Sequence, residues 1–119
     1  MDGHLDSTNA AWITIELSNG PLDFLIDTGF QGTLIIGEDV FDSGNAEWAG
    51  ETHADLAAGQ SWTYTEYFIE IERFGEPVKV QALVGPGSEC LVGTDILAPH
   101  NLDIDYRTGK VQLIKSVDW

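Results

Sequence analysis

The sequence predicts an all-β fold with one short helix near the C-terminal end. Three observations predict it: apolar and polar residues alternate over several short runs, turn-forming residues separate these runs, and helical periodicity is rare. About eight to ten short strands at this spacing are typical of a closed or folded-over antiparallel sheet. Because 119 residues suit one hydrophobic core, we expect a flexible N-terminal segment at 1–10 and a single domain at 11–119.

The first half of the domain contains short strands separated by turn residues. Ile13, Ile15 and Leu17 recur with a period of two, which indicates a half-buried strand. Ser, Asn, Gly and Pro at 18–21 then turn the chain. We expect strands at 11–17, 22–26 and 33–36, followed by a single helical turn at 37–41.

The second half contains the longest strand, at 62–74. Its period of two assigns one face to Thr63, Thr65, Tyr67, Ile69 and Ile71. The remaining predicted elements are a strand at 52–56, a small-residue tip at 57–61, strands at 78–84, 90–93, 101–105 and 110–114, and one or two helical turns at 94–100.

The composition excludes several classes of partner. Twenty acidic residues against five basic ones give a formal charge of −15, so nucleic acids and anionic membranes are poor partners. The acidic surface either keeps the protein soluble or adjusts association through repulsion that salt screens. A lone cysteine, Cys90, excludes an intrachain disulfide, and no signal-type segment or membrane-length apolar run is present, so we expect a cytoplasmic protein.

An acid at the end of an apolar strand is the main candidate for chemistry. The run Phe24-Leu25-Ile26 leads directly into Asp27-Thr28-Gly29. A carboxylate in a partly desolvated place needs hydrogen bonds, which the Thr28 hydroxyl and the amides around Gly29 can donate. The alternative is an ordinary turn after a strand. Asp42-Ser43-Gly44 has a similar pattern within a polar segment, which favours a surface turn there.

A second signal lies at Leu91-Val92-Gly93, another apolar strand that ends in glycine and is followed by a short helix. Asp-Thr-Gly followed by this later motif resembles the retropepsin-like, or retroviral-type, aspartic proteases, over residues 11 to about 114. Phe30 and Gln31 replace the usual alanine and acidic residue, and Thr94 replaces the usual arginine. The sequence is therefore most similar to the cellular and prokaryotic single-domain members.

The resemblance implies a homodimeric aspartic endopeptidase that needs no metal or other cofactor. Each chain contributes one Asp27, and the two carboxylates share a proton and activate water against an extended peptide. Thr28 would brace the two active-site loops, Gly29 would line the cleft, and Leu91, Val92 and Gly93 would support the loop. A hairpin through 57–61 would form a flap. We expect the substrate to contact Leu25, Phe30, Gln31, Leu34, Ala58, Gly59 and Trp62.

Two other classes of protein remain open. One is a protease-like dimerisation or peptide-binding module that cleaves little, and the other is an acidic interaction protein whose Asp-Thr-Gly is merely a turn. A metal site is not indicated, because His4, His53 and His100 lack ligand spacing. Cys90 is expected to be packed rather than reactive.

Overall fold

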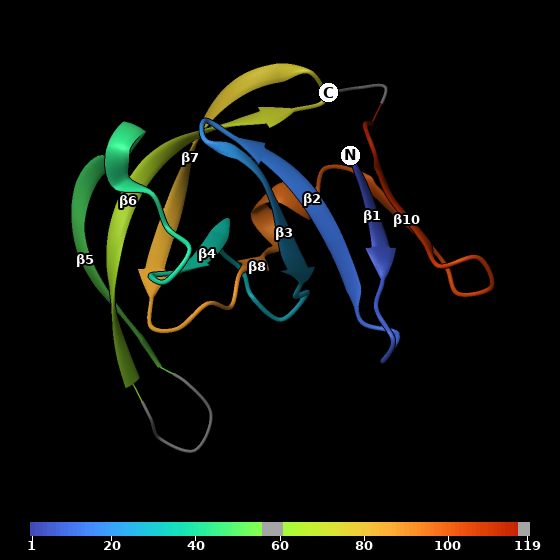
Figure 1. Cartoon of the computed structure of the whole chain (residues 1–119), viewed down its shortest axis with the longest axis horizontal. Coiled ribbons are helices and arrows are strands. Elements are labelled where there is room, and N and C mark those ends of the chain that lie inside the picture. The colour runs from blue at the N-terminus through green and yellow to red at the C-terminus, as the bar shows by residue number, and fades with distance from the viewer. Residues whose placement is uncertain (56–60, 117–119) are drawn as a thin grey trace.

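The computed structural model describes residues 1–55 and 61–116, which form a single curved sheet with short helical turns (Figure 1). The elements are β1 Asp2–Leu5, β2 Ala11–Leu17, β3 Gly20–Ile26, β4 Leu34–Gly37, β5 Glu47–Asp55, β6 Ser61–Arg73, β7 Glu76–Gly85, β8 Leu91–Val92, β9 Asn101–Asp105, β10 Lys110–Ile114, the 3-10 turn η1 Ser43–Asn45 and helix α1 Thr94–Leu97. Strands β2 and β3 form a hairpin, and β5, β6 and β7 form a long meander.

The strand order is β5-β6-β7-β4-β8-β3-β2-β1-β10-β9, and a further pairing of β6 with β2 closes a ring of strands. The predicted all-β class with a short helix near the C-terminal end is confirmed. Two pairings differ from the predicted antiparallel arrangement, because β8 runs parallel to β3 and β4 runs parallel to β7. These strands are distant in sequence, so no hairpin dictates their direction.

The core is one cluster of mainly aliphatic side chains around Phe24, contributed by the ring strands, β10 and α1. Ile13 and Ile15 of β2 are buried, as their alternation predicts, and Phe24 of β3 is fully buried beside them. Among the described residues, the other large, fully buried side chains are Leu34, Ile36, Ile71, Val92, Ile96, Val111 and Leu113. The N-terminal and C-terminal halves therefore share one hydrophobic core.

Strand β6 does not keep one buried face along its length. Ile69 and Ile71 are buried as predicted, but Tyr64, assigned to the opposite face, is buried too. Its ring covers Gly85, where an added Cβ atom would lie 2.5 Å from Tyr64 Cε1. A strand of 13 residues follows the curvature of the sheet (Figure 1), so opposite faces are covered at its two ends.

The N-terminal residues differ from the predicted flexible segment at 1–10. Asp2–Leu5 form β1, which pairs with both β2 and β10. The Asp6 carboxylate then accepts hydrogen bonds from the Thr8 amide at 2.8 Å, the Thr8 hydroxyl at 2.7 Å and Trp12 Nε1 at 2.8 Å. These bonds, led by the Thr8 hydroxyl, hold the pKa of Asp6 well below its usual range.

Two smaller elements also differ from the sequence prediction. Strand β5 begins at Glu47 rather than at residue 52, and it contains a register shift between Trp48 and Gly50. The helical turn predicted at 37–41 is a single hydrogen-bonded turn, in which the Val40 amide donates to Gly37 O at 3.1 Å. Within the described residues, no helix has the length and apolar character needed to cross a membrane.

Candidate active site

Asp27 follows β3 at the point where that strand lies beside β8. Its amide donates to Val92 O at 3.0 Å, and its side chain is half-buried. Carboxylate Oδ1 accepts a hydrogen bond from the Gly29 amide at 3.0 Å. The hydrogen bond from the Asp27 amide to Val92 and the one from the Gly29 amide to the Asp27 carboxylate together restrict the orientation of this side chain.

The same local contact occurs at Asp42, where Oδ1 accepts from the Gly44 amide at 2.9 Å. An aspartate that caps a turn in this way is common and has no chemical specificity. The surroundings distinguish the two acids, because Asp42 is exposed and caps η1, whereas Asp27 follows a core strand. Asp42 thus provides a matched reference for Asp27 within the same chain.

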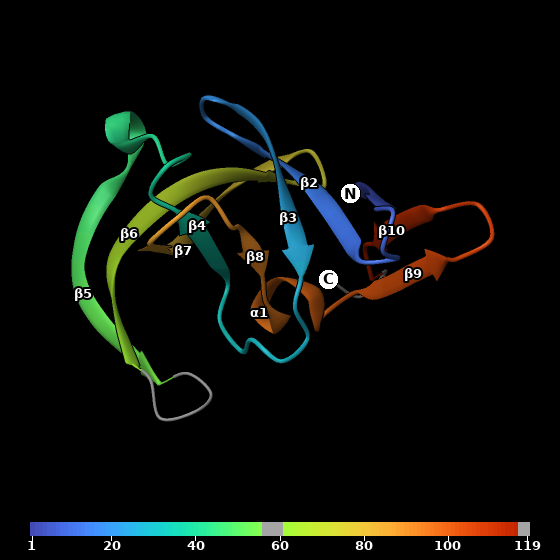
Figure 2. The same ribbon diagram turned by 60° about the horizontal axis from the view of Figure 1, so that its bottom comes forward.

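The loop at 28–33 is attached to the start of α1 by backbone hydrogen bonds (Figure 2). The Thr94 amide donates to Phe30 O at 2.9 Å, and the Asp95 amide donates to Gly32 O at 3.2 Å. At the end of the loop, the amide of Gly93, the residue before α1, donates to Thr33 O at 2.9 Å. Amides at the first turn of a helix have no partner within the helix, so the loop carbonyls satisfy them.

The predicted support segment lies directly beside this loop. Leu91 pairs with Leu25 and Val92 pairs with Ile26 in the parallel β3–β8 ladder. Gly93 is buried, and a Cβ atom added there would lie 2.2 Å from Gly32 O. Only glycine permits this close approach of the two backbones.

The predicted substrate contacts have different surroundings. Leu25 and Phe30 are half-buried, Gln31 is exposed, and Leu34 is 1% exposed. Leu34 therefore cannot contact a peptide in this structure, because the alternation in β4 turns it into the core together with Ile36. Its assignment to the substrate wall was wrong.

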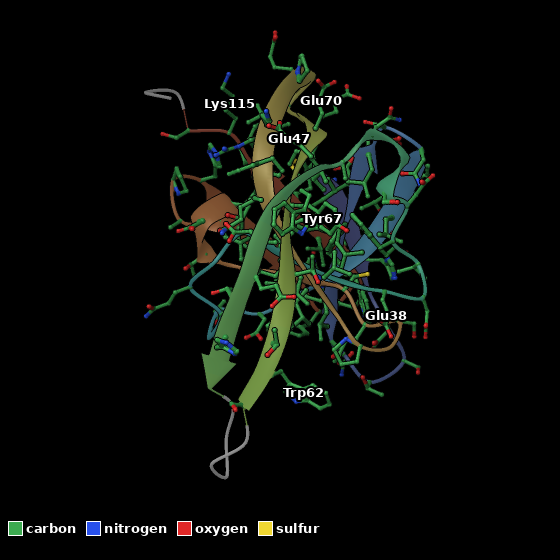
Figure 3. All side chains as sticks on the ribbon, turned by 90° about the vertical axis from the view of Figure 1, so that its left-hand side faces the viewer. Glu38, Glu47, Trp62, Tyr67, Glu70 and Lys115 are labelled. Atoms are coloured by element: carbon green, nitrogen blue, oxygen red, sulfur yellow. The ribbon has the colours of Figure 1, made fainter. Side chains whose placement is uncertain are left out.

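The hairpin formed by β5 and β6 carries the remaining predicted contacts. Trp62 is 45% exposed and projects from the hairpin end of β6 (Figure 3). Ala58 and Gly59 lie outside the described residues. Thr28 and Gly29, predicted for support and for the cleft, are exposed on the surface of the single chain.

Two other reactive side chains, Cys90 and His53, have contacts of their own. Burial raises the pKa of the Cys90 thiol, whose Sγ lies 3.8 Å from Ser88 O. His53 Nδ1 lies 3.0 Å from the Thr63 hydroxyl on the β5–β6 hairpin. Over residues 1–55 and 61–116, no group of three or more His, Cys, Asp or Glu side chains is arranged to hold a metal ion.

One feature of the site has little sequence signal. The Phe30 ring packs against Gly32 and Gly93, whereas the sequence indicates only an aromatic residue next to Asp-Thr-Gly. The two glycines that accommodate the ring are visible in the sequence. Their proximity to each other is not, because it depends on the parallel pairing of β3 with β8.

The chain has the fold of the retropepsin-like aspartic proteases. A crystal structure of a retropepsin-like aspartic protease from Rickettsia conorii matches it with a TM-score of 0.65 and 17% sequence identity, covering 97% of this chain and 89% of that one. The chain is also similar to dipeptidyl aminopeptidase BIII of Pseudoxanthomonas mexicana, with 28% identity over 86 residues. That match covers 66% of this chain but 12% of the aminopeptidase. No family model matches the chain.

Proposed function

We propose that the protein is a homodimeric aspartic endopeptidase in which each chain supplies one Asp27. The observation that carries this proposal is the position of Asp27 at the end of a core strand, on a loop attached to β8 and α1. The retropepsin-like fold supports the same reaction class. The exposed Asp42, with the same amide contact, has no such surroundings.

The chemistry accounts for the need for two chains. Peptide hydrolysis by carboxylates needs one ionised group to accept a proton from water and one protonated group to polarise the scissile carbonyl. Two adjacent carboxylates achieve this by sharing a proton, because both cannot be ionised cheaply at short range. Thr28 and Gly29 are exposed beside Asp27, which leaves this surface available to an identical chain across a two-fold axis.

The substrate is an extended peptide or an unfolded protein segment. In the proposed dimer, Thr28 braces the two loops and Gly29 lines the cleft, while Leu91, Val92 and Gly93 support the loop from behind. Exposed Gln31 and Trp62 are available for substrate contacts, and half-buried Leu25 contributes a partial wall. The cytoplasmic location rests on the sequence alone.

A digest of a peptide library tests the proposal with a matched pair of variants. Asp27→Asn removes one ionisable group, and Asp42→Asn makes the same change in a turn with the same amide contact. We expect Asp27→Asn to abolish cleavage and Asp42→Asn to retain it. Equal cleavage by the wild type and Asp27→Asn would refute the assignment. Binding of peptides without cleavage by the wild-type dimer would favour the peptide-binding module instead.

A further inference from the structure

We propose that Phe30 is a positioning residue for Asp27, and this inference rests on the proposed protease function. The Phe30 side chain is half-buried and lies against two glycines, one in its own loop and one before α1. The ring thereby packs beside the backbone hydrogen bonds that join the Asp27 loop to the start of α1.

The contacts of the ring follow from the space around the two glycines. A Cβ atom on Gly32 would lie 2.5 Å from Phe30 Cζ and 2.7 Å from Cε1, so the ring lies on the open face of that glycine. A Cβ atom on Gly93 would lie 2.6 Å from Phe30 Cδ2. One edge of the ring thus contacts the loop and another contacts the residue before α1. Any larger residue at position 32 or 93 would displace the ring.

The backbone of Phe30 connects this ring to the acid. Its amide donates to Asp27 O at 3.1 Å, and its carbonyl accepts from the Thr94 amide at 2.9 Å. A rotation of residue 30 therefore changes both the turn that begins at Asp27 and the attachment to α1. The Asp27 carboxylate belongs to the same turn, because its Oδ1 accepts from the Gly29 amide at 3.0 Å.

This arrangement predicts a specific kinetic effect. Without the ring, residue 30 can rotate away from its present hydrogen bonds to Asp27 and Thr94, and the carboxylate moves away from the position that it needs in the transition state. A displacement of about 1 Å at a reacting group costs on the order of 100-fold in rate. The effect should fall on kcat rather than on KM, because in this role the ring contacts the two glycines in place of the peptide contact expected for Phe30 from the sequence.

Phe30→Ala tests the inference, and Phe68→Ala is its matched control. Phe68 is 38% exposed on β6, so the control removes the same atoms from a surface position. Rates are compared at chain concentrations high enough that the rate per chain no longer rises, so that incomplete dimerisation does not affect them. Under these conditions we expect kcat to fall about 10- to 100-fold in Phe30→Ala, with KM within about twofold of the wild type. Phe30→Leu, which refills part of the space, should recover part of kcat, and Phe68→Ala should retain the wild-type value.

A double-mutant cycle identifies the ring as the cause. Gly32→Ala introduces a clash with Phe30 ring atoms, so we expect it to lower kcat in the wild-type background and to cost little more in Phe30→Ala. Gly93→Ala serves as the contrast, because its Cβ atom would also lie 2.2 Å from Gly32 O. Removal of the ring should not rescue that variant.

The outcomes separate this inference from the proposed function. If Asp27→Asn abolishes cleavage but Phe30→Ala keeps the wild-type kcat, the positioning role is wrong and the protease assignment stands. Independent effects of Phe30→Ala and Gly32→Ala that multiply in the double variant would also refute the role of the ring. If Asp27→Asn cleaves as well as the wild type, the protease assignment itself fails.

Discussion

The amide of Asp27 donates to the carbonyl oxygen of Val92 at 3.0 Å, which joins the end of β3 to the end of β8. This bond continues the parallel ladder in which Ile26 pairs with Val92. It holds the candidate catalytic acid against a segment that is far away in the sequence. The stability of the site and the position of its acid therefore depend on the same contacts.

Gly93→Ala should destabilise the fold as well as the site. The added Cβ atom would lie 2.2 Å from Gly32 O and 2.6 Å from Phe30 O, and backbone atoms cannot rotate away. Overpacking of this kind costs about 1–3 kcal/mol of unfolding free energy. Urea unfolding measures this loss of unfolding free energy. The control is Gly44→Ala in the exposed Asp42 turn, which should change the unfolding free energy by less than about 0.5 kcal/mol. Equal stability of the two variants would contradict the close approach.

Association of the proposed dimer should depend strongly on salt. Each chain carries a formal charge of −15 at pH 7, and dimerisation brings two such charges together. Salt screens the repulsion, since the Debye length falls from about 30 Å at 0.01 M to about 8 Å at 0.15 M. Sedimentation at neutral pH should therefore show weaker association at low salt, and mild acid should strengthen it. A dimer population that responds to neither would contradict this prediction.

His100 should make the fold less stable in mild acid. Burial, together with the charges of Arg73 and Lys115, lowers the pKa of His100 below its ordinary value of 6.5. The unfolded chain then binds the proton more tightly, so the stabilisation is complete above pH 6.5 and is lost as the pH falls through the lowered pKa. Urea unfolding at about pH 7.5 and pH 5.5 should show a smaller loss for His100→Gln than for the wild type.

The control for that experiment is His4→Gln, at an exposed position on β1. It removes an imidazole from an exposed strand position, whereas His100 is half-buried and its ring centroid lies 4.7 Å from that of Phe74. We expect His4→Gln to keep the wild-type loss of stability on acidification. If His4→Gln and His100→Gln show the same loss, His100 is not its source.

Cys90 should resist thiol reagents in the native protein. Its side chain is 4% exposed, and burial raises its pKa, so both access and thiolate formation are disfavoured. Labelling with a chromogenic disulfide at neutral pH should proceed at the rate of unfolding. Addition of urea should raise the labelling rate of Cys90 to that of an exposed thiol. Fast, complete labelling without denaturant would contradict the packed environment.

Local patterns were sufficient to predict much of the fold. The alternation of Ile13 and Ile15 predicts the buried face of β2, and the apolar run before Asp27 predicts a strand that leads into an acid. Such predictions succeed because the period of a strand and the chemistry of a turn depend on neighbouring residues. The resemblance to retropepsin-like proteases added the overall architecture, which the structural match confirms.

The remaining features depend on contacts between distant segments. Sequence patterns do not reveal that β1 fits between β2 and β10, that Tyr64 covers Gly85, or that Leu34 faces the core. They also do not show that Phe30 packs against Gly93, because that contact follows from the parallel alignment of β8 with β3. The periodicity of one strand specifies which residues share a face. The pairing and twist of the whole sheet specify which side chains pack against that face.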